Sequence, residues 1–277
     1  MARALLSYET LVHALAGATG SIVGMSAFYP LDTIRSRLQV EDTNKLKGSS
    51  WEILLRLGKE EGFDALYRGL YPVLQSLSVS NFVYFYSFHA LRKAASSKSA
   101  LQDLMFGIIA GSINVLLTSP LWVVNTRMKL QKDIYPSLLG GLRHIFMNEG
   151  VKGLWSGTLP SLLLVSNPAI QFMVYESVKR NLLHKGSFDT YTAFLVGALA
   201  KAVATTLTYP MQLVQARLRA GTSLKPLIKQ VKENPLVLFR GLEAKLLQTV
   251  LTAALMFTIY ERLVRTVLTI MRVKVKH

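Results

Sequence analysis

The chain has 277 residues, of which 51% are hydrophobic, and its 32 Lys and Arg against 16 Asp and Glu give a formal charge of +16. So large an apolar share excludes a disordered chain and an ordinary nucleic-acid-binding chain. The sequence contains no cysteine, which excludes disulfides, thiolate metal sites and a cysteine nucleophile.

Six long segments carry few or no formal charges. Residues 10–31, 69–88, 104–126 and 153–175 contain no Asp, Glu, Lys or Arg, residues 190–216 contain only Lys201, and residues 246–260 follow Glu243 and Lys245. A bilayer core needs about 20 mainly apolar residues per spanning helix. We therefore predict an all-α membrane protein with six transmembrane helices. The alternative is a large soluble helical protein with buried helices.

An internal repeat organises the chain. Pro30, Pro120 and Pro210 are 90 residues apart, and an arginine follows each proline by seven positions. An aromatic residue also stands two positions before each of Gly69, Gly157 and Gly241. Such self-similarity indicates tandem structural repeats. We expect three repeats of about 90 residues in one integral domain, at 1–98, 99–186 and 187–277, with pseudo-threefold symmetry. Short amphipathic helices near 49–61, 136–148 and 224–233 join the paired helices.

The residues that follow the three prolines identify a family. The sequence Pro-Leu-Asp-Thr-Ile-Arg-Ser-Arg at 30–37, with degenerate copies after Pro120 and Pro210, resembles the signature of the mitochondrial carrier family, and the resemblance covers residues 7–266. It implies a transporter that works by alternating access through one central site. No catalytic triad, histidine cluster, paired carboxylates or phosphate loop appears, so we expect neither an enzyme nor a metal site.

The resemblance also implies two gates. Prolines inside long helices bend them, and in the family the acid two positions after one proline pairs with the base five positions after the next. These pairs are Asp32 with Asn125, Trp122 with Gln215, and Gln212 with Arg35. None is a full ion pair, so we expect this gate to open easily. At the opposite gate the pairs are His89 with Lys179, Glu176 with Val264, and Glu261 with Arg92. The alternative is that these charges only solvate helix ends.

Two arginines and three glycines stand where helices restart. By resemblance these residues bind anionic lipid headgroups: Arg68, Gly69, Gly157, Arg240 and Gly241. A free helix N-terminus offers N–H groups to a phosphate. The alternative is an ordinary helix-start turn with a snorkelling arginine.

Intramembrane polar residues are the candidates for the substrate site. Lys201 is the only charge in its segment and breaks the threefold pattern, and such charges are usually functional. We expect it to bind phosphate or another anion; the alternative is a snorkelling lysine or a structural pair with Glu243. Asn114 either reads a base or ribose edge or makes an interhelical hydrogen bond.

Further candidates lie on the second helix of each repeat. Polar side chains within apolar stretches are Asn81, Asn167, Gln171, Lys245 and Gln248. The contact points of the family map to Ser76, Leu163, Leu164 and Thr249. The leucine pair resembles carriers that stack an adenine-like ring. The aromatic stretch 82–86 either stacks a ring system or only packs helices.

Trp122 resembles a branch of the family that carries nucleotides, NAD, FAD, folate and coenzyme A, and Asn125 and the stretch 241–257 are similar to a peroxisomal carrier within that branch. The resemblance implies a monomeric antiporter in the peroxisomal membrane that exchanges coenzyme A, FAD, NAD or related cofactors for adenine nucleotides such as AMP. The partners implied are these anionic solutes and membrane lipids, with no nucleic acid, and an import receptor for peroxisomal membrane proteins is a candidate partner. The alternatives are a mitochondrial inner-membrane carrier for nucleotides, FAD or folate, and a degenerate carrier that serves as a membrane scaffold.

Overall fold

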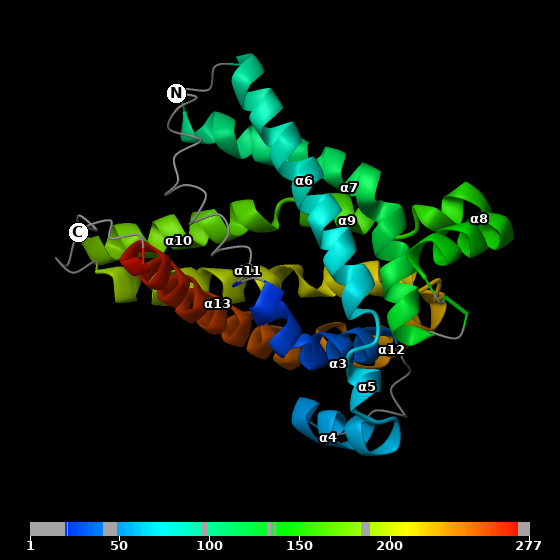
Figure 1. The fold of residues 1–277 in the computed structure, drawn as a ribbon. Coiled ribbons are helices and arrows are strands. Elements are labelled where there is room, and N and C mark those ends of the chain that lie inside the picture. The colour runs from blue at the N-terminus through cyan, green and yellow to red at the C-terminus, as the bar shows by residue number, and fades with distance from the viewer. Residues whose placement is uncertain are drawn as a thin grey trace.

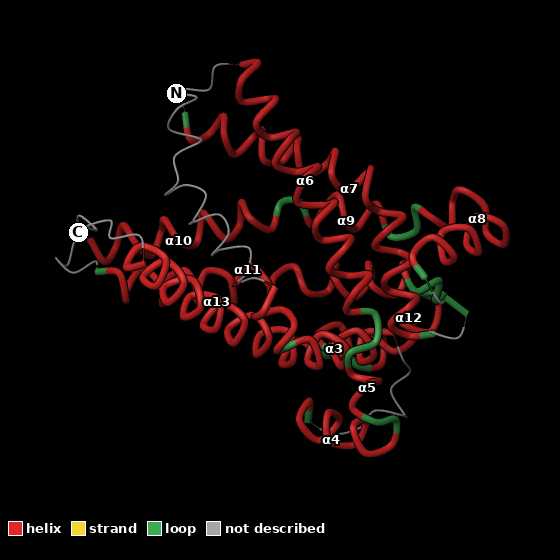
Figure 2. Tube along the Cα trace, viewed as in Figure 1, coloured by secondary structure: helices red, strands yellow, loops and turns green. Residues whose placement is uncertain are grey.

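The structure, a computed structural model, describes residues 20, 22–40, 49–95, 99–131, 134, 135, 137–183 and 189–270. The described part of the chain consists of helices joined by short loops and contains no strand, as Figure 2 shows. The helices in chain order are α3 (Tyr29–Val40), α4 (Ser50–Glu60), α5 (Phe63–Leu66), α6 (Leu70–Ala95), α7 (Ala100–Leu130), α8 (Leu138–Leu154), α9 (Thr158–Leu164), α10 (Asn167–Leu183), α11 (Thr190–Arg219), α12 (Lys225–Glu233), the 3-10 helix η1 (Pro235–Phe239) and α13 (Leu242–Ile270). The all-α prediction is confirmed. Half of the first predicted membrane segment, at 10–19 and 21, and both predicted repeat boundaries lie outside the described residues.

Side-chain caps begin several of these helices. Ser49 accepts a hydrogen bond from the backbone of Glu52, whose side chain accepts one from the Ser49 backbone, which is a capping box. Ser99, Ser137 and Asp189 cap α7, α8 and α11 in the same way, each accepting from a backbone N–H of the first turn. These caps fix where the helices of the second and third repeats begin.

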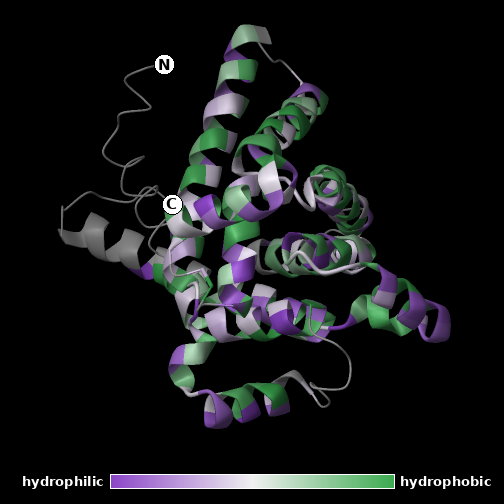
Figure 3. Cartoon of the chain, turned by 90° about the vertical axis from the view of Figure 1, so that its right-hand side faces the viewer, coloured by the Kyte–Doolittle hydropathy of each residue, from purple (hydrophilic) through white to green (hydrophobic). Residues whose placement is uncertain are grey.

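Each repeat has a small apolar core of its own. In the first repeat the cluster consists of Ile34, Leu38, Ile53, Leu57 and Leu66. The second repeat uses residues of α7 and α8, and the third uses residues of α11, α12 and η1. In every case the cluster holds a short helix against the end of the long helix that follows the repeat's proline. Figure 3 shows hydrophilic and hydrophobic residues alternating along the short helices, as expected for helices at a membrane surface.

Long helices from different repeats lie side by side. The closest pairs are α6 with α7, α10 with α11, and α13 with α3, so each pair joins one repeat to the next and the last joins the third repeat to the first. In Figure 1 the pairs spread apart at one end of the molecule and converge at the other, near α4, α8 and α12. At the convergent end α3, α7 and α11 all contact one another. We call these the open end and the closed end.

Two described helices are long and apolar enough to cross a membrane, at Leu101–Leu130 and Thr192–Arg219. A third span results if Leu138–Leu154 and Thr158–Leu182, bent by 51° at their break, count as one. The helices α6 and α13 have 26 and 29 residues but do not meet this measure. Their uncharged stretches contain Ser, Gln, Asn, Thr and Tyr, which lower mean hydropathy without adding charge.

Three glycine turns close the molecule into a ring. Gly69, Gly157 and Gly241 have φ angles of 79°, 78° and 81°, a region that only glycine adopts at no cost. A Cβ added to Gly69 would lie 3.2 Å from Lys129 Cγ, and one added to Gly157 would lie 3.1 Å from Arg219 Cγ. At Gly241 it would lie 3.4 Å from Cβ of Leu38 in the first repeat. Each repeat therefore rests its turn on the helix end of the next repeat, and the third rests on the first.

Arginines make the same connections. The Nε of Arg127 donates a hydrogen bond to the carbonyl of Arg219 at 3.1 Å, and the Nε of Arg217 donates to the carbonyl of Gln39 at 2.9 Å. Both bonds join a repeat to the next one around the ring. They satisfy carbonyls at or near the C-terminal ends of α11 and α3, which a helix leaves unpaired, and they place a cation where the helix dipole favours it.

Candidate functional site

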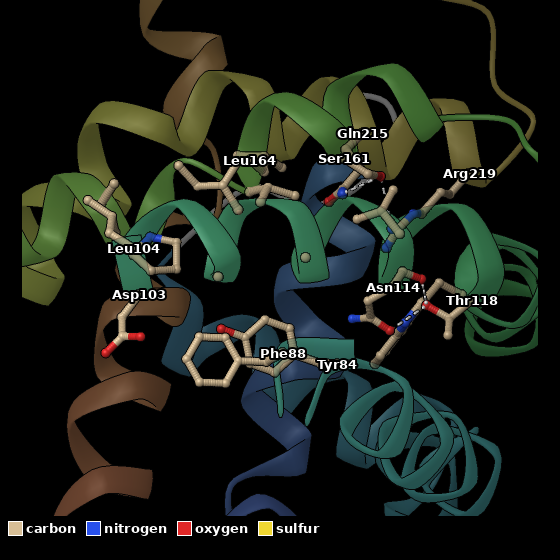
Figure 4. Close-up of a pocket in the computed structure, with 18 residues that line it drawn as sticks. Tyr84, Phe88, Asp103, Leu104, Asn114, Thr118, Ser161, Leu164, Gln215 and Arg219 are labelled. Carbon is tan, nitrogen blue, oxygen red and sulfur yellow. Dashed lines mark hydrogen bonds between the residues drawn. The ribbon is translucent and has the colours of Figure 1, made fainter. Parts of the chain in front are cut away.

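Two cavities of similar size lie between the long helices. The first, of about 500 Å³, is lined by α6, α7, α9, α10 and α11; Figure 4 shows its side chains. The second, of about 480 Å³, is lined by α3, α7, α11 and α13 and by a residue of α6. Trp122, Gln215 and Arg219 line both cavities, so the two share a wall. Volumes in this range suit small-molecule ligands.

The second cavity is strongly cationic. Its lining includes the five cationic side chains Arg35, Lys129, Lys201, Arg219 and Lys245, against the single carboxylate of Asp32. Cations placed between membrane helices are costly unless they serve a solute or a partner. The lining therefore favours a ligand with several negative charges.

The carboxylate of Asp32 is held by two cations. Asp32 forms an ion pair with Arg35 at 2.9 Å, one turn along α3, and a second ion pair with the Nζ of Lys129 on α7. The Nζ of Lys129 also lies 5.0 Å from the centroid of the Tyr29 ring, within the range of a cation–π contact. This cluster joins the first repeat to the second at the closed end.

The gate partners expected from the resemblance make other contacts. Asn125 is 1% exposed, and neither its Nδ2 nor its Oδ1 has a hydrogen-bond partner among the described residues. The Nε2 of Gln215 donates to Ser161 at 2.7 Å, and that of Gln212 donates to Thr208 at 3.2 Å. The partner of Asp32 on α7 is thus Lys129, one helical turn after Asn125.

At the open end the charged side chains pair locally. Arg92 on α6 forms an ion pair with Asp103 on α7 at 3.3 Å, and Lys179 pairs with Glu176 on its own helix at 3.7 Å. The side chains of Glu261 and Val264 lie outside the described residues. These local pairs agree with the spread of the helices at this end.

Lys201 lies at the cationic cavity, beside an amide. Its Nζ donates a hydrogen bond to Oδ1 of Asn167 at 3.3 Å, and Nδ2 of Asn167 donates to Thr208 at 2.7 Å. No acidic side chain among the described residues lies within ion-pair distance of Lys201. The amide therefore orients the ammonium group, while its positive charge stays available to a ligand.

The other predicted substrate residues divide into two groups. Those that line one of the two cavities are Asn114 and Leu164 in the first and Lys245, Gln248 and Thr249 in the second. Those that line neither are Ser76, Asn81, Leu163, Asn167 and Gln171. Ser76 is buried without a hydrogen-bond partner among the described residues. Asn81 lines a hollow on another face of α6.

Asn114 makes the interhelical bond that was one of its two interpretations. Its Nδ2 donates to the hydroxyl of Ser80 on α6 at 2.9 Å, and its backbone carbonyl accepts from Thr118 at 2.8 Å. It still lines the first cavity, as Figure 4 shows. Its position is therefore fixed by α6, which leaves its remaining amide capacity for a ligand.

Two of the three predicted lipid sites, at Gly69 and Gly241, share one local structure. The hydroxyls of Tyr29 and Tyr209, each directly before a repeat proline, donate to the carbonyls of Arg68 and Arg240 at 3.0 and 2.8 Å. The Nη1 of Arg68 also lies 3.5 Å from a carboxylate oxygen of Glu61. These bonds hold the turns at Gly69 and Gly241, whose backbones begin α6 and α13.

Sequence reasoning missed Lys129 and Arg219. Both lie nine positions after a repeat proline, where the first repeat has Gln39. All three residues line the second cavity, so the polar or charged residue at this position of each repeat is the signal for them in the sequence. Among the described residues no group of His, Cys, Asp and Glu could hold a metal ion.

Comparison with known proteins agrees with the repeat and the fold. A family model described as mitochondrial carrier protein matches residues 7–99, 96–186 and 187–270. The chain is 49% identical over 303 residues to the peroxisomal membrane protein PMP34 of Mus musculus, an alignment that covers 99% of this chain and 98% of that protein. It is 33% identical over 318 residues to the peroxisomal nicotinamide adenine dinucleotide carrier of Arabidopsis thaliana, with 93% and 96% coverage.

The family model and the Arabidopsis relative are named as carriers, and both relatives named above are peroxisomal. Two membrane proteins of Candida boidinii, PMP47A and PMP47B, are also peroxisomal and are 30% and 29% identical to the chain. The protein is accordingly a transporter of the peroxisomal membrane. With three matched repeats and near-complete coverage, the chain belongs to the mitochondrial carrier family.

Proposed function

We propose that this carrier is an antiporter that exchanges coenzyme A, FAD, NAD or a related cofactor for an adenine nucleotide such as AMP. The single observation that carries the proposal is the lining of the second cavity, with five cationic side chains against one carboxylate. Each of these cofactors carries phosphate groups, which Lys and Arg bind by charge-assisted hydrogen bonds. A neutral solute would leave these charges uncompensated.

Within the cavity, Lys201 and Lys245 on α11 and α13 are the proposed phosphate ligands. Both lysines line the cavity, and neither forms an ion pair with a described acidic residue. Gln248 and Asn125 are buried beside them with side-chain atoms that have no described partner. Buried amides without partners are costly, and a polar solute or its water shell would satisfy them.

Alternating access would operate between the two ends of the molecule. In the present state the helices converge at the closed end (Figure 1), where the Asp32 cluster joins α3 to α7. They spread apart at the open end (Figure 1), where the described ion pairs join only the adjacent helices α6 and α7 or residues within α10. The cavities lie within one chain, so a monomer is sufficient for transport. We propose that membrane lipids contact the carrier at the glycine turns. The proposed partner for its insertion into the membrane is an import receptor for peroxisomal membrane proteins.

A degenerate carrier that acts as a membrane scaffold is the competing hypothesis. It would explain why the expected gate pairs are incomplete. It would leave the cationic cavity without a purpose, because a scaffold gains nothing from charges that must be held among membrane helices.

Exchange across proteoliposomes tests the proposal. Vesicles with coenzyme A, FAD, NAD or a dicarboxylate inside are given labelled AMP outside. We expect uptake that requires an internal cofactor and that falls at least tenfold in Lys201→Ala. The matched control is Lys229→Ala, which removes an exposed lysine of α12 and should leave uptake unchanged.

Three outcomes are informative. Equal uptake by wild type and Lys201→Ala would support the proposed transport function but contradict the assignment of Lys201 as a phosphate ligand. Uptake that needs no internal solute would contradict antiport. The absence of uptake with every internal solute, from protein with a cooperative thermal transition, would favour the scaffold.

A further inference from the structure

The first cavity has two chemically different ends. In Figure 4, Tyr84 and Phe88 lie together at one end, and Ser161, Gln215 and Arg219 lie at the other. Gln215 and Arg219 also line the cationic cavity. A ligand whose phosphate binds Arg219, which lines both cavities, would therefore place the rest of its structure toward an aromatic surface.

The aromatic surface is a parallel pair of rings. Tyr84 and Phe88 are four residues apart on α6, so they lie on one face of the helix. Their ring centroids are 6.3 Å apart, and the ring planes differ by only 11°. Aromatic faces bind other planar rings by offset stacking, and stacking on such faces is how proteins hold nucleobases of any sequence.

Space for a ring beside this pair comes from the first cavity itself, of about 500 Å³, which both rings line. Gly107 of α7 lies against the hydroxyl of Tyr84, because a Cβ added there would be in contact with it at 3.4 Å. Leu104 and Leu164 supply apolar neighbours. One turn further along α7 the helices close up, because a Cβ on Gly111 would lie 2.7 Å from Val165. The cavity is therefore open beside the rings and limited beyond them.

We propose that Tyr84 and Phe88 bind the aromatic ring system of the transported solute and so select solutes that carry an adenine-like ring. The inference rests on the proposed function and adds to it a ring subsite on α6, distinct from the cationic cavity. Arg219 and Gln215 bridge the two parts. The ring subsite explains why the first cavity has an aromatic end although the neighbouring second cavity is cationic.

The chain supplies a matched control pair on the same helix. Phe82 and Tyr86 are also four residues apart, with ring centroids 5.9 Å apart and planes 18° from parallel. They are 70% and 69% exposed and line a hollow on another face of α6. They have the same chemistry and spacing as Tyr84 and Phe88 but do not line the first cavity.

Binding of two probes to purified protein in detergent tests the subsite. The probes are AMP, which carries the ring, and ribose 5-phosphate, which lacks it, and the readout is ligand-dependent thermal stabilisation. For the double variant Tyr84→Leu/Phe88→Leu we expect the dissociation constant of AMP to rise about tenfold, or ~1.4 kcal/mol, with ribose 5-phosphate unchanged. Phe82→Leu/Tyr86→Leu should change neither value, and Tyr84→Phe should behave as wild type because it keeps the ring.

The outcomes separate this subsite from the proposed function. An unchanged AMP constant, an equal loss for both probes, or an equal effect in the control pair would each overturn the ring subsite. If the double variant does not fold, Phe88→Leu alone takes its place with the same expectations. Wild-type protein that binds AMP through the rings but exchanges no nucleotide in vesicles would instead reject the antiport function and retain the subsite.

Discussion

Lys129 gives Asp32 a cationic partner on the neighbouring repeat, a role that the uncharged Asn125 does not fill. Asp32, Lys129 and Asn125 are all buried, where an unpaired carboxylate is strongly destabilising. Arg35 approaches the same carboxylate from α3. One buried acid thus holds two cations from two repeats, and its removal would leave like charges facing each other.

A double-mutant cycle measures this connection. We expect Asp32→Asn and Lys129→Met to be coupled by about 1–3 kcal/mol in thermal unfolding, since residues in one charged network couple by such amounts. Asp32→Asn and Asn125→Ala should be additive within about 0.5 kcal/mol. Equal coupling in both cycles would show that proximity, and not the ion pair, joins the repeats here.

Two factors favour glycine over other residues at the glycine turns: a positive φ angle and a close contact with a neighbouring side chain. Gly241 has a φ of +81°, and an added Cβ would lie 2.9 Å from the Tyr209 hydroxyl. Gly62 has almost the same φ, +82°, with nothing within 4 Å. The two positions therefore separate backbone strain from loss of space.

Alanine at each position tests that separation. Gly62→Ala should cost about 1 kcal/mol from backbone strain alone. Gly241→Ala should cost at least about 1 kcal/mol more, because Tyr209 must move and its hydrogen bond to Arg240 is weakened. Thermal unfolding in detergent gives both values. Equal costs would mean that the turn has room to relax.

Among the elements, the short helices are held to the long ones by ion pairs. Arg37 of α3 donates to Glu61 after α4 at 2.7 Å, and Arg127 of α7 donates to Glu149 of α8 at 2.8 Å. The hydrogen-bonded guanidinium of Arg37 holds the pKa of Glu61 below its usual range. A carboxylate with a depressed pKa stabilises the fold at neutral pH, and the contribution is lost as the pH falls through that lowered pKa.

This pH dependence gives a prediction for α4. Glu61→Gln should lower the free energy of unfolding by roughly 1 kcal/mol at pH 7, the upper range for a partly exposed pair. The difference from wild type should shrink as the pH falls below the usual ~4.3 of a glutamate and through the lowered pKa of Glu61. Glu60→Gln, at an exposed neighbouring position, should show no such dependence. A difference that does not change with pH below neutral would assign the effect to packing.

Much of the element pattern was predictable from the sequence because it rests on local signals. The 90-residue spacing of the prolines and the charge-free segments predicted the repeats and the long helices, and the structure has a short helix at each of the three expected places. The pairing within the cation cluster was not predictable. It depends on which turn of α7 faces α3, and a shift of one turn from Asn125 to Lys129 is too small for a composition argument to resolve.

For the substrate residues the same limit applies. Lys201 stood out because it is a charge in an apolar segment, and the structure places it at the cationic cavity. Asn81 and Gln171 stood out for the same kind of reason and line neither cavity. A polar residue in a helix can face the axis or a neighbour, and the sequence alone does not fix the rotation of the helix.

At the scale of the whole molecule the two ends should face opposite sides of the membrane. The helix α6 begins at the closed end and has 26 residues, which span about 39 Å. Ala94 near its end and Ser223 after α11 are both exposed. The chain has no cysteine, so single-cysteine variants can be labelled without background.

Labelling with an impermeant maleimide in oriented vesicles checks this arrangement. Ala94→Cys should react from one side only and Ser223→Cys from the other side only. Reaction of both from the same side would require a different path for α6 through the bilayer.

The ring formed by the glycine turns has a mechanical consequence. The three contacts between repeats form a closed ring, so no repeat has an unpaired edge. One contact cannot widen far while the other two stay intact. The helix ends must therefore separate together, so the transition between the states open to either side of the membrane should be cooperative rather than gradual. The contact between the first and second repeats, which carries the buried charges of the Asp32 cluster, then sets the energy barrier for opening the whole ring.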